Sequence, residues 1–71
     1  MTEKESSFKK IATRRTQNIL DNIRLLSNCS NTNNYSFTEK DINKIFRSID
    51  DELKTCKAMF RKNNSKKKFK L

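Results

Sequence analysis

The spacing of apolar residues between Ile42 and Phe60 limits the possible folds of this chain more than any other feature. Successive apolar side chains are three or four residues apart, which places them along one face of an α-helix. We therefore predict a long amphipathic helix over about 38–62. Its apolar stripe consists of Ile42, Ile45, Phe46, Ile49, Leu53, Cys56 and Phe60.

The residues before this stripe have the properties of a helix start. Thr38 can cap the helix, because its hydroxyl can accept a hydrogen bond from a backbone N–H of the first turn. Asp41 follows three residues later, as in a capping box, with Asp in place of the usual Glu or Gln. Glu39 and Asp41 also place negative charge near the positive end of the helix dipole.

A second helical pattern comes earlier, and we predict a helix over about 7–28 after six polar, frayed residues. Its main stripe consists of Phe8, Ala12, Ile19, Ile23 and Leu26. Ile11, Leu20 and Leu25 lie on both flanks of this stripe. They are either isolated exposed apolar residues, which are common, or a surface for a partner outside the chain. We therefore treat Ile11, Leu20 and Leu25 as candidate partner-binding residues.

Residues 29–37, between the two helices, form a connection rich in Asn and Ser, whose side chains compete with helix by bonding to nearby backbone. Asn28 or Asn31 can end the first helix in the left-handed conformation. The chain has no Gly or Pro, so tight turns lack their usual residues, and no segment alternates as a strand does. These features predict an all-α protein, and the short connection favours an antiparallel two-helix hairpin over residues 1–62.

The composition leaves little material for a core. Only 32% of the 71 residues are hydrophobic, and domains this small often need a partner, so we expect the hairpin to be completed by another protein or by dimerisation. Cys56 would lie about 27 Å along the second helix, too far for a disulfide with Cys29. With no His, the chain offers no zinc site, and we predict no metal or cofactor.

Catalysis has little support in the sequence. The chain has neither a Ser-His-Asp set nor a Gly-rich phosphate loop. Asp50, Asp51 and Glu52 are consecutive, so on a helix they project in three directions and do not form a carboxylate pair. We predict no enzymatic activity and no small-molecule substrate. With no apolar run long enough for a membrane span or a signal peptide, we also predict a cytoplasmic location without membrane contact.

The net charge of +9 is unevenly distributed along the chain. Residues 38–60 are neutral, whereas residues 61–71 carry only positive charges, and we predict that residues 63–71 form a disordered basic tail. Lys9, Lys10, Arg14 and Arg15 lie in the opening turns of the first helix, where they oppose the helix dipole. In an antiparallel hairpin these two basic clusters lie at the same end of the molecule.

A basic surface at one end is typical of proteins that bind a nucleic-acid backbone. Lys10, Arg14 and Arg24 share one outer face of the first helix, and Phe69 could stack on an exposed base. A solvated face and a solubilising tail are the alternative explanation. The candidate nucleic-acid-binding residues are Lys9, Lys10, Arg14, Arg15, Arg24, Arg61, Lys62, Lys66, Lys67, Lys68, Phe69 and Lys70.

Two segments carry a resemblance. Arg-Arg-Thr-Gln-Asn-Ile-Leu-Asp-Asn-Ile-Arg-Leu-Leu-Ser-Asn-Cys-Ser-Asn over residues 14–31 and Asn-Tyr-Ser-Phe-Thr-Glu-Lys-Asp-Ile-Asn-Lys-Ile-Phe over residues 34–46 resemble short basic proteins of mobile genetic elements in Firmicutes. Within that group they are similar to the small companion of the A-family polymerase of staphylococcal cassette chromosomes. The resemblance implies a non-catalytic partner of a polymerase that acts as a primase, with contact to single-stranded DNA.

The sequence therefore favours a non-catalytic accessory protein in DNA replication or maintenance of a mobile element. Such a protein would bind a larger replication protein, such as a polymerase or helicase, or a second copy of itself. Its basic residues would contact nucleic-acid phosphates, with single-stranded DNA favoured. The alternative is a protein-interaction module without nucleic-acid binding, such as a homodimeric helical bundle or an inhibitor of a host protein.

Overall fold

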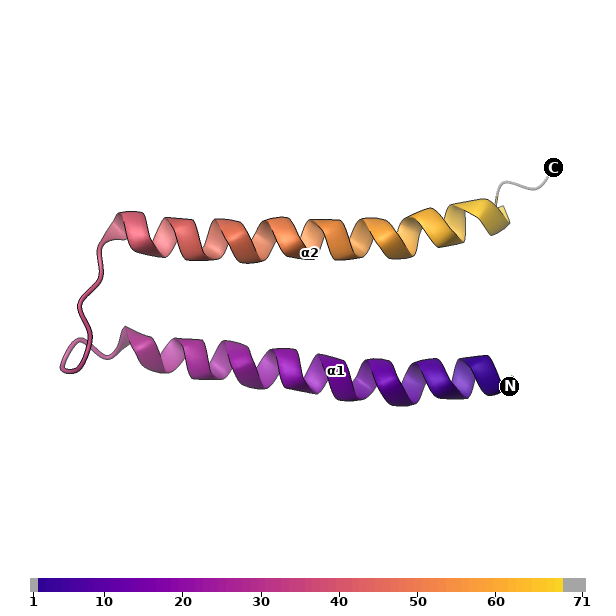
Figure 1. The fold of residues 1–71 in the computed structure, drawn as a ribbon, viewed down its shortest axis with the longest axis horizontal. Helices are drawn as coiled ribbons and strands as arrows, with labels where there is room; N and C mark the ends of the chain where they lie inside the picture. Colours follow the sequence, from indigo (N-terminus) through magenta and orange to yellow (C-terminus); the bar gives the residue numbers. More distant parts are fainter. Residues whose placement is uncertain (1, 69–71) are drawn as a thin grey trace. The chain divides into compact units, whose positions relative to one another are not determined.

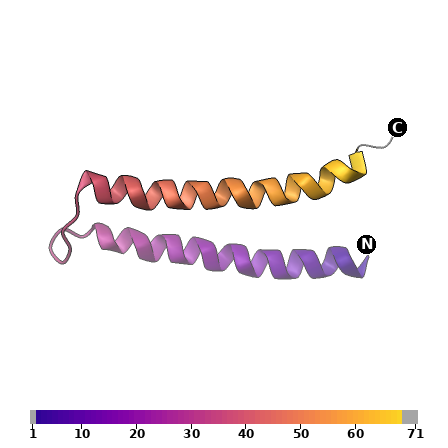
Figure 2. The ribbon, with the colours of Figure 1, turned by 45° about the horizontal axis from the view of Figure 1, so that its top comes forward.

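The computed structural model describes residues 2–68, with the backbone alone for residues 64–68. Within this range the chain forms two α-helices, α1 over Glu3–Ser27 and α2 over Glu39–Lys68, and a short 3-10 helix, η1, over Asn28–Ser30 (Figures 1 and 2). Helices α1 and η1 belong to one compact unit and α2 to a second, which begins at Phe37. Over residues 2–68 there is no strand, and the prediction of an all-α protein is confirmed.

Helix α1 begins four residues earlier than the sequence analysis predicted. Thr2 caps it, because the Thr2 hydroxyl accepts a hydrogen bond from the Glu5 backbone N–H over 3.1 Å. In return, a Glu5 carboxylate oxygen accepts one from the Thr2 backbone N–H over 2.9 Å. The prediction of frayed residues up to Ser6 was therefore wrong for the described residues from Glu3 onward, because this reciprocal capping box satisfies the first turn.

Helix α1 ends without a left-handed residue. Asn28 has φ −65° and Asn31 has φ −70°, so neither adopts the left-handed conformation that the sequence suggested. The chain tightens instead into η1, and the Asn28 backbone N–H donates to the carbonyl groups of Leu25 and Leu26. A 3-10 turn satisfies terminal helix carbonyls as a left-handed residue does, without placing an Asn at positive φ.

Helix α2 begins as predicted. The Thr38 hydroxyl accepts a hydrogen bond from the Asp41 backbone N–H over 3.1 Å, and Asp41 Oδ2 accepts one from the Thr38 backbone N–H over 3.0 Å. The shorter carboxylate of Asp41 thus replaces the usual Glu or Gln of a capping box. Glu39 and Asp41 lie in the first turn, so their negative charges also stabilise the positive end of the helix dipole.

Helix α2 ends later than predicted. Its backbone remains helical to Lys68, whereas we expected an end near residue 62 and disorder from residue 63. The predicted helix end near residue 62 was therefore too early, whereas disorder of the basic tail in solution stays a prediction. Lysine is a good helix former, the segment contains no Gly or Pro, and cations are favourable near a helix C-terminus. The rest of the predicted tail, residues 69–71, lies outside the described residues.

Neither helix has buried residues among those whose side chains are described. Ala12 and Leu26 of α1 and Ile42 and Ile49 of α2 are half-buried, and each belongs to the apolar stripe predicted for its helix. The larger stripe residues remain exposed, from 38% for Ile45 to 57% for Phe8. Each helix therefore carries an exposed apolar stripe of its own. No helix in the described range is long and apolar enough to cross a membrane.

Candidate nucleic-acid interface

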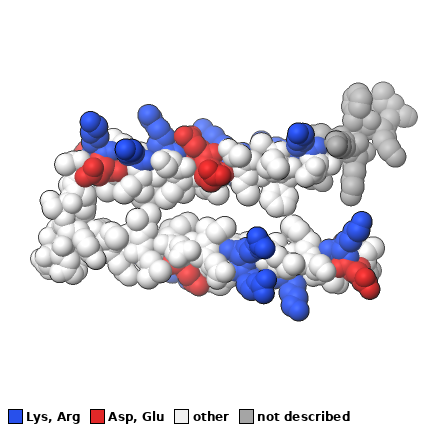
Figure 3. All heavy atoms as spheres, viewed as in Figure 1, with Lys and Arg blue, Asp and Glu red and all other residues white. Residues whose placement is uncertain are grey.

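The basic residues of α1 gather in its N-terminal half. Lys9, Lys10, Arg14 and Arg15 occupy two successive turns and are all exposed. Figure 3 shows the Lys and Arg side chains of α1 concentrated toward the N-terminal end of that helix. None of these four side chains forms an ion pair with an acidic residue of the described chain. Their charges are therefore available to a ligand.

Helix electrostatics do not explain this cluster. The cluster begins at Lys9, more than a turn after the helix start at Glu3. The prediction that these four cations oppose the helix dipole was therefore wrong, because the dipole acts mainly on the first turn. Glu3 and Glu5 compensate in the first turn of α1, and Glu5 does so as part of the capping box. The four cations lie in the turns after these acids, and none of them forms an ion pair within the described residues. An external anion is the simplest charge that would balance them.

Arg24 differs from the other candidates, because it is already paired. Arg24 donates a hydrogen bond to Asp21 Oδ1 over 3.1 Å, and both side chains remain largely exposed. Gln17 Nε2 donates to the same oxygen over 3.0 Å. We predicted that Arg24 shares a face with Lys10 and Arg14, but Asp21 lies on the same face. The spacing of Asp21 and Arg24, three residues on a helix, was the available clue.

Helix α2 carries a mixture of charges followed by a basic end. Arg61 and Lys62 are exposed on its described surface. The last described turns of α2 include Lys66, Lys67 and Lys68, for which only the backbone is described. Two further candidates, Phe69 and Lys70, lie outside the described residues. The stacking role predicted for Phe69 therefore remains a prediction.

The three candidate partner-binding residues all lie on α1 and are exposed. The exposed fractions are 41% for Ile11, 43% for Leu20 and 62% for Leu25. Leu25 is the most exposed of the large apolar side chains described. An apolar side chain this exposed gains free energy when a partner covers it, roughly 25 cal/mol for each Å² removed from water.

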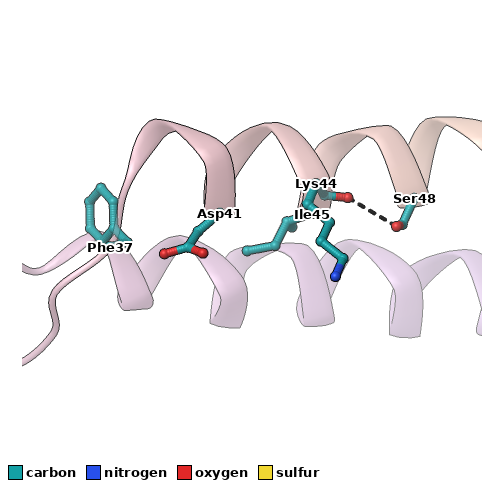
Figure 4. Close-up of a pocket in the computed structure, with 5 residues that line it drawn as sticks. All are labelled: Phe37, Asp41, Lys44, Ile45 and Ser48. Atoms are coloured by element: carbon teal, nitrogen blue, oxygen red, sulfur yellow. Dashed lines mark hydrogen bonds between the residues drawn. The ribbon is translucent and has the colours of Figure 1, made fainter.

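A shallow hollow lies on α2 near its start (Figure 4). It is lined by Phe37, Asp41, Lys44, Ile45 and Ser48, and Ser48 Oγ donates a hydrogen bond to the Lys44 carbonyl over 2.9 Å. Among the described residues, its walls come from α2 and from the residue before the α2 cap. Ligand sites usually enclose most of the ligand, which an open hollow of this kind does not do.

Cys29 and Cys56 are both free and exposed. Over the described part of the chain, no group of three His, Cys, Asp or Glu residues could hold a metal ion. Comparisons of the chain with protein-family models, with curated proteins and with solved structures found no match.

Proposed function

We propose that this protein is a non-catalytic accessory protein in DNA replication or maintenance of a mobile element. It binds nucleic-acid phosphates through basic side chains, with single-stranded DNA favoured, and binds a protein partner through exposed apolar side chains. One observation carries the nucleic-acid part. Lys9, Lys10, Arg14 and Arg15 are four exposed cations on two successive turns, without a carboxylate partner in the described chain.

In this proposal α1 and α2 form an antiparallel hairpin. The two apolar stripes need cover, and a short connection between long helices favours an antiparallel neighbour. The pairing places the basic start of α1 beside Arg61 and Lys62 at the end of α2. Each cluster alone is small, and together they give a phosphate backbone several contacts at one end of the molecule.

A protein partner follows from the apolar surface. Ile11 and Leu25 lie on one flank of the α1 stripe and Leu20 on the other, so a single helix cannot cover all three. We propose that a replication protein such as a polymerase or helicase, or a second copy of the chain, covers these residues. Residues 14–31 and 34–46 resemble small proteins of Firmicute mobile elements. This resemblance supports a polymerase that acts as a primase as the protein partner.

The rival function is a protein-interaction module without nucleic-acid binding, such as a homodimeric helical bundle or an inhibitor of a host protein. The exposed apolar side chains of both helices favour it as much as they favour the leading proposal. In that case the basic residues would serve only to keep the protein in solution.

Fluorescence anisotropy with labelled single- and double-stranded DNA of matched length separates the two functions. The test variant carries Lys9→Gln and Lys10→Gln. Its control carries Lys44→Gln and Lys54→Gln, which removes equal charge from the mixed-charge part of α2. The proposal predicts salt-dependent binding that the test variant weakens more than the control. Absence of binding at low salt, or equal losses in both variants, would leave the rival function.

A further inference from the structure

We propose that α1 pairs in antiparallel orientation with α1 of a second copy, through the face that carries Ile11, Asn18 and Leu25. This inference rests on the protein-binding part of the function proposed above and identifies the partner. The three residues are seven apart, so they lie along one side of the helix with a drift of only about 20° at each step. All three are exposed in the structure, and Leu25 is the most exposed.

The spacing of these residues has two-fold symmetry about Asn18. When two identical surfaces meet about a two-fold axis, each residue contacts its counterpart in both directions. With Asn18 at the axis, Ile11 of one copy meets Leu25 of the other, and Leu25 of the first meets Ile11 of the second. One contact between Ile11 and Leu25 therefore forms on each side of a central Asn18 pair. The side-chain amide of Asn is both donor and acceptor, so Asn18 can hydrogen-bond to its own copy.

The charges that border this face are complementary in the same arrangement. Arg14 and Asp21 lie three residues after Ile11 and Asn18, respectively, and so share one edge of the face. In an antiparallel pair the same edges of the two helices adjoin, which brings Arg14 of one copy near Asp21 of the other. Both hydrogen bonds that Asp21 accepts go to Oδ1. Oδ2 has no partner in the described chain and can accept from Arg14 of the second copy.

The opposite edge is compatible as well. Arg15 and Asn22 lie four residues after Ile11 and Asn18, respectively, so the antiparallel arrangement sets Arg15 of one copy near Asn22 of the other. These two residues interrupt the main apolar stripe of α1, and the pairing gives each of them a partner.

Antiparallel orientation is also favoured by the overall charge of α1. A parallel pair would place the four cations of one copy, Lys9 to Arg15, beside the same four cations of the other. The antiparallel pair moves these clusters toward opposite ends of the interface. Like charges brought close together are destabilising, so the charge pattern selects the antiparallel orientation. Asn18 at the centre adds to this selection, because a single polar residue in a helix interface specifies register.

The first measurement is sedimentation equilibrium of the full chain without nucleic acid. Because each copy contributes only two apolar side chains to this face, we expect an equilibrium that depends on protein concentration. The apparent mass should rise from 8.4 kDa toward twice that value as concentration increases. Leu25→Lys should keep the mass at that of one copy. Met59→Lys, on α2, is the matched control, because it adds the same charge to a similarly exposed apolar side chain away from the pairing face, and it should dimerise. A mass that stays at one copy throughout would overturn the proposal.

Disulfide trapping tests the orientation. Cys29 and Cys56 are exposed, so both can be replaced by Ser without disturbing the helices. Single cysteines are then introduced into this cysteine-free chain. Asn18→Cys should form a disulfide between copies, because its Cα atoms meet at the axis within the roughly 7 Å that a disulfide requires. Ile11→Cys should not link to itself, because its two copies lie about 21 Å apart along the helices. A mixture of Ile11→Cys and Leu25→Cys chains should link. Efficient self-linking of Ile11→Cys would show a parallel pair and overturn the proposal.

The two proposals can fail separately. Arg14 faces Asp21 of the second copy in the dimer, so the nucleic-acid test uses Lys9 and Lys10, which lie off the pairing face. Lys9→Gln with Lys10→Gln should weaken DNA binding while the apparent mass still doubles. DNA binding by a chain that stays at one copy would overturn the dimer alone and assign Ile11 and Leu25 to a different protein.

Discussion

Thr38 and Asp41 exchange two hydrogen bonds between backbone and side chain at the start of α2, over 3.1 and 3.0 Å. Thr2 and Glu5 make the same exchange at the start of α1. The two segments share the residues Thr-Glu-Lys followed by an acid, so the chain uses one capping motif twice. These contacts lie within each helix, so they stabilise its first turn whatever the helix packs against.

Thr38→Ala should therefore reduce the stability of α2 by about 1 kcal/mol, because the first-turn N–H groups lose their acceptor. Far-ultraviolet circular dichroism during thermal unfolding measures this loss. Thr38→Ser should retain most of the stability. The matched control is Thr55→Ala, which removes a hydroxyl that donates to the Asp51 carbonyl inside the helix. That change should be neutral or slightly stabilising, because Ala is the better helix former. Equal losses at both positions would contradict the capping role.

Thr2→Ala should unwind the first turn of α1 and leave the rest of the helix intact. The Thr2 hydroxyl is the acceptor for the Glu5 N–H, and loss of a cap costs about 1 kcal/mol that falls on the terminal turn. Amide hydrogen exchange followed by NMR should show faster exchange at Glu5 and Ser6 and unchanged exchange near Ile19. Unchanged exchange in the first turn would mean that the box contributes little.

The sequence predicted the start of α2 and missed the start of α1 for one physical reason. At Thr38 the cap precedes an apolar stripe directly, so both features agreed. At Thr2 the residues after the cap are polar, and their polarity suggested fraying although the pattern Thr-x-x-Glu was present. The end of α2 was missed for a related reason. Apolar spacing stops at Phe60, whereas the backbone continues as long as its residues favour helix.

The candidate nucleic-acid interface was also predicted only in part from the sequence. The sequence alone shows which residues are cationic and that several of them cluster on α1. Whether a cation is free depends on its neighbours in three dimensions. Arg24 was grouped with Lys10 and Arg14 because they share a face, but that face also contains Asp21, which holds Arg24 through its Oδ1. Whether two side chains pair depends on their rotamers. The spacing of residues along a helix allows a pair to form but does not determine which rotamers are adopted.

Arg24 should for this reason contribute less to DNA binding than Lys10. Lys10→Gln should lower the affinity for single-stranded DNA and reduce the slope of its salt dependence by about 0.7, as expected for one lost phosphate contact. Arg24→Gln should change both quantities less, since its charge is already partly compensated by Asp21. Asp21→Asn should raise the affinity, because it frees Arg24 and removes a negative charge. Anisotropy titrations at several salt concentrations measure all three variants. Equal effects of Lys10→Gln and Arg24→Gln would show that the ion pair opens on binding.

A chain that ends at Asn63 should bind single-stranded DNA with a weaker salt dependence. It lacks Lys66, Lys67, Lys68 and Lys70, and each phosphate contact on a single strand contributes about 0.7 to the slope of log affinity against log salt. The magnitude of the slope should therefore fall by up to about 3. Replacing the same four lysines by Gln in the full chain keeps its length and should give the same fall. If truncation lowers the slope and the Gln variant does not, Phe69 or the length of the chain matters instead of charge. A slope unchanged in both would remove the C-terminal lysines from the proposed interface.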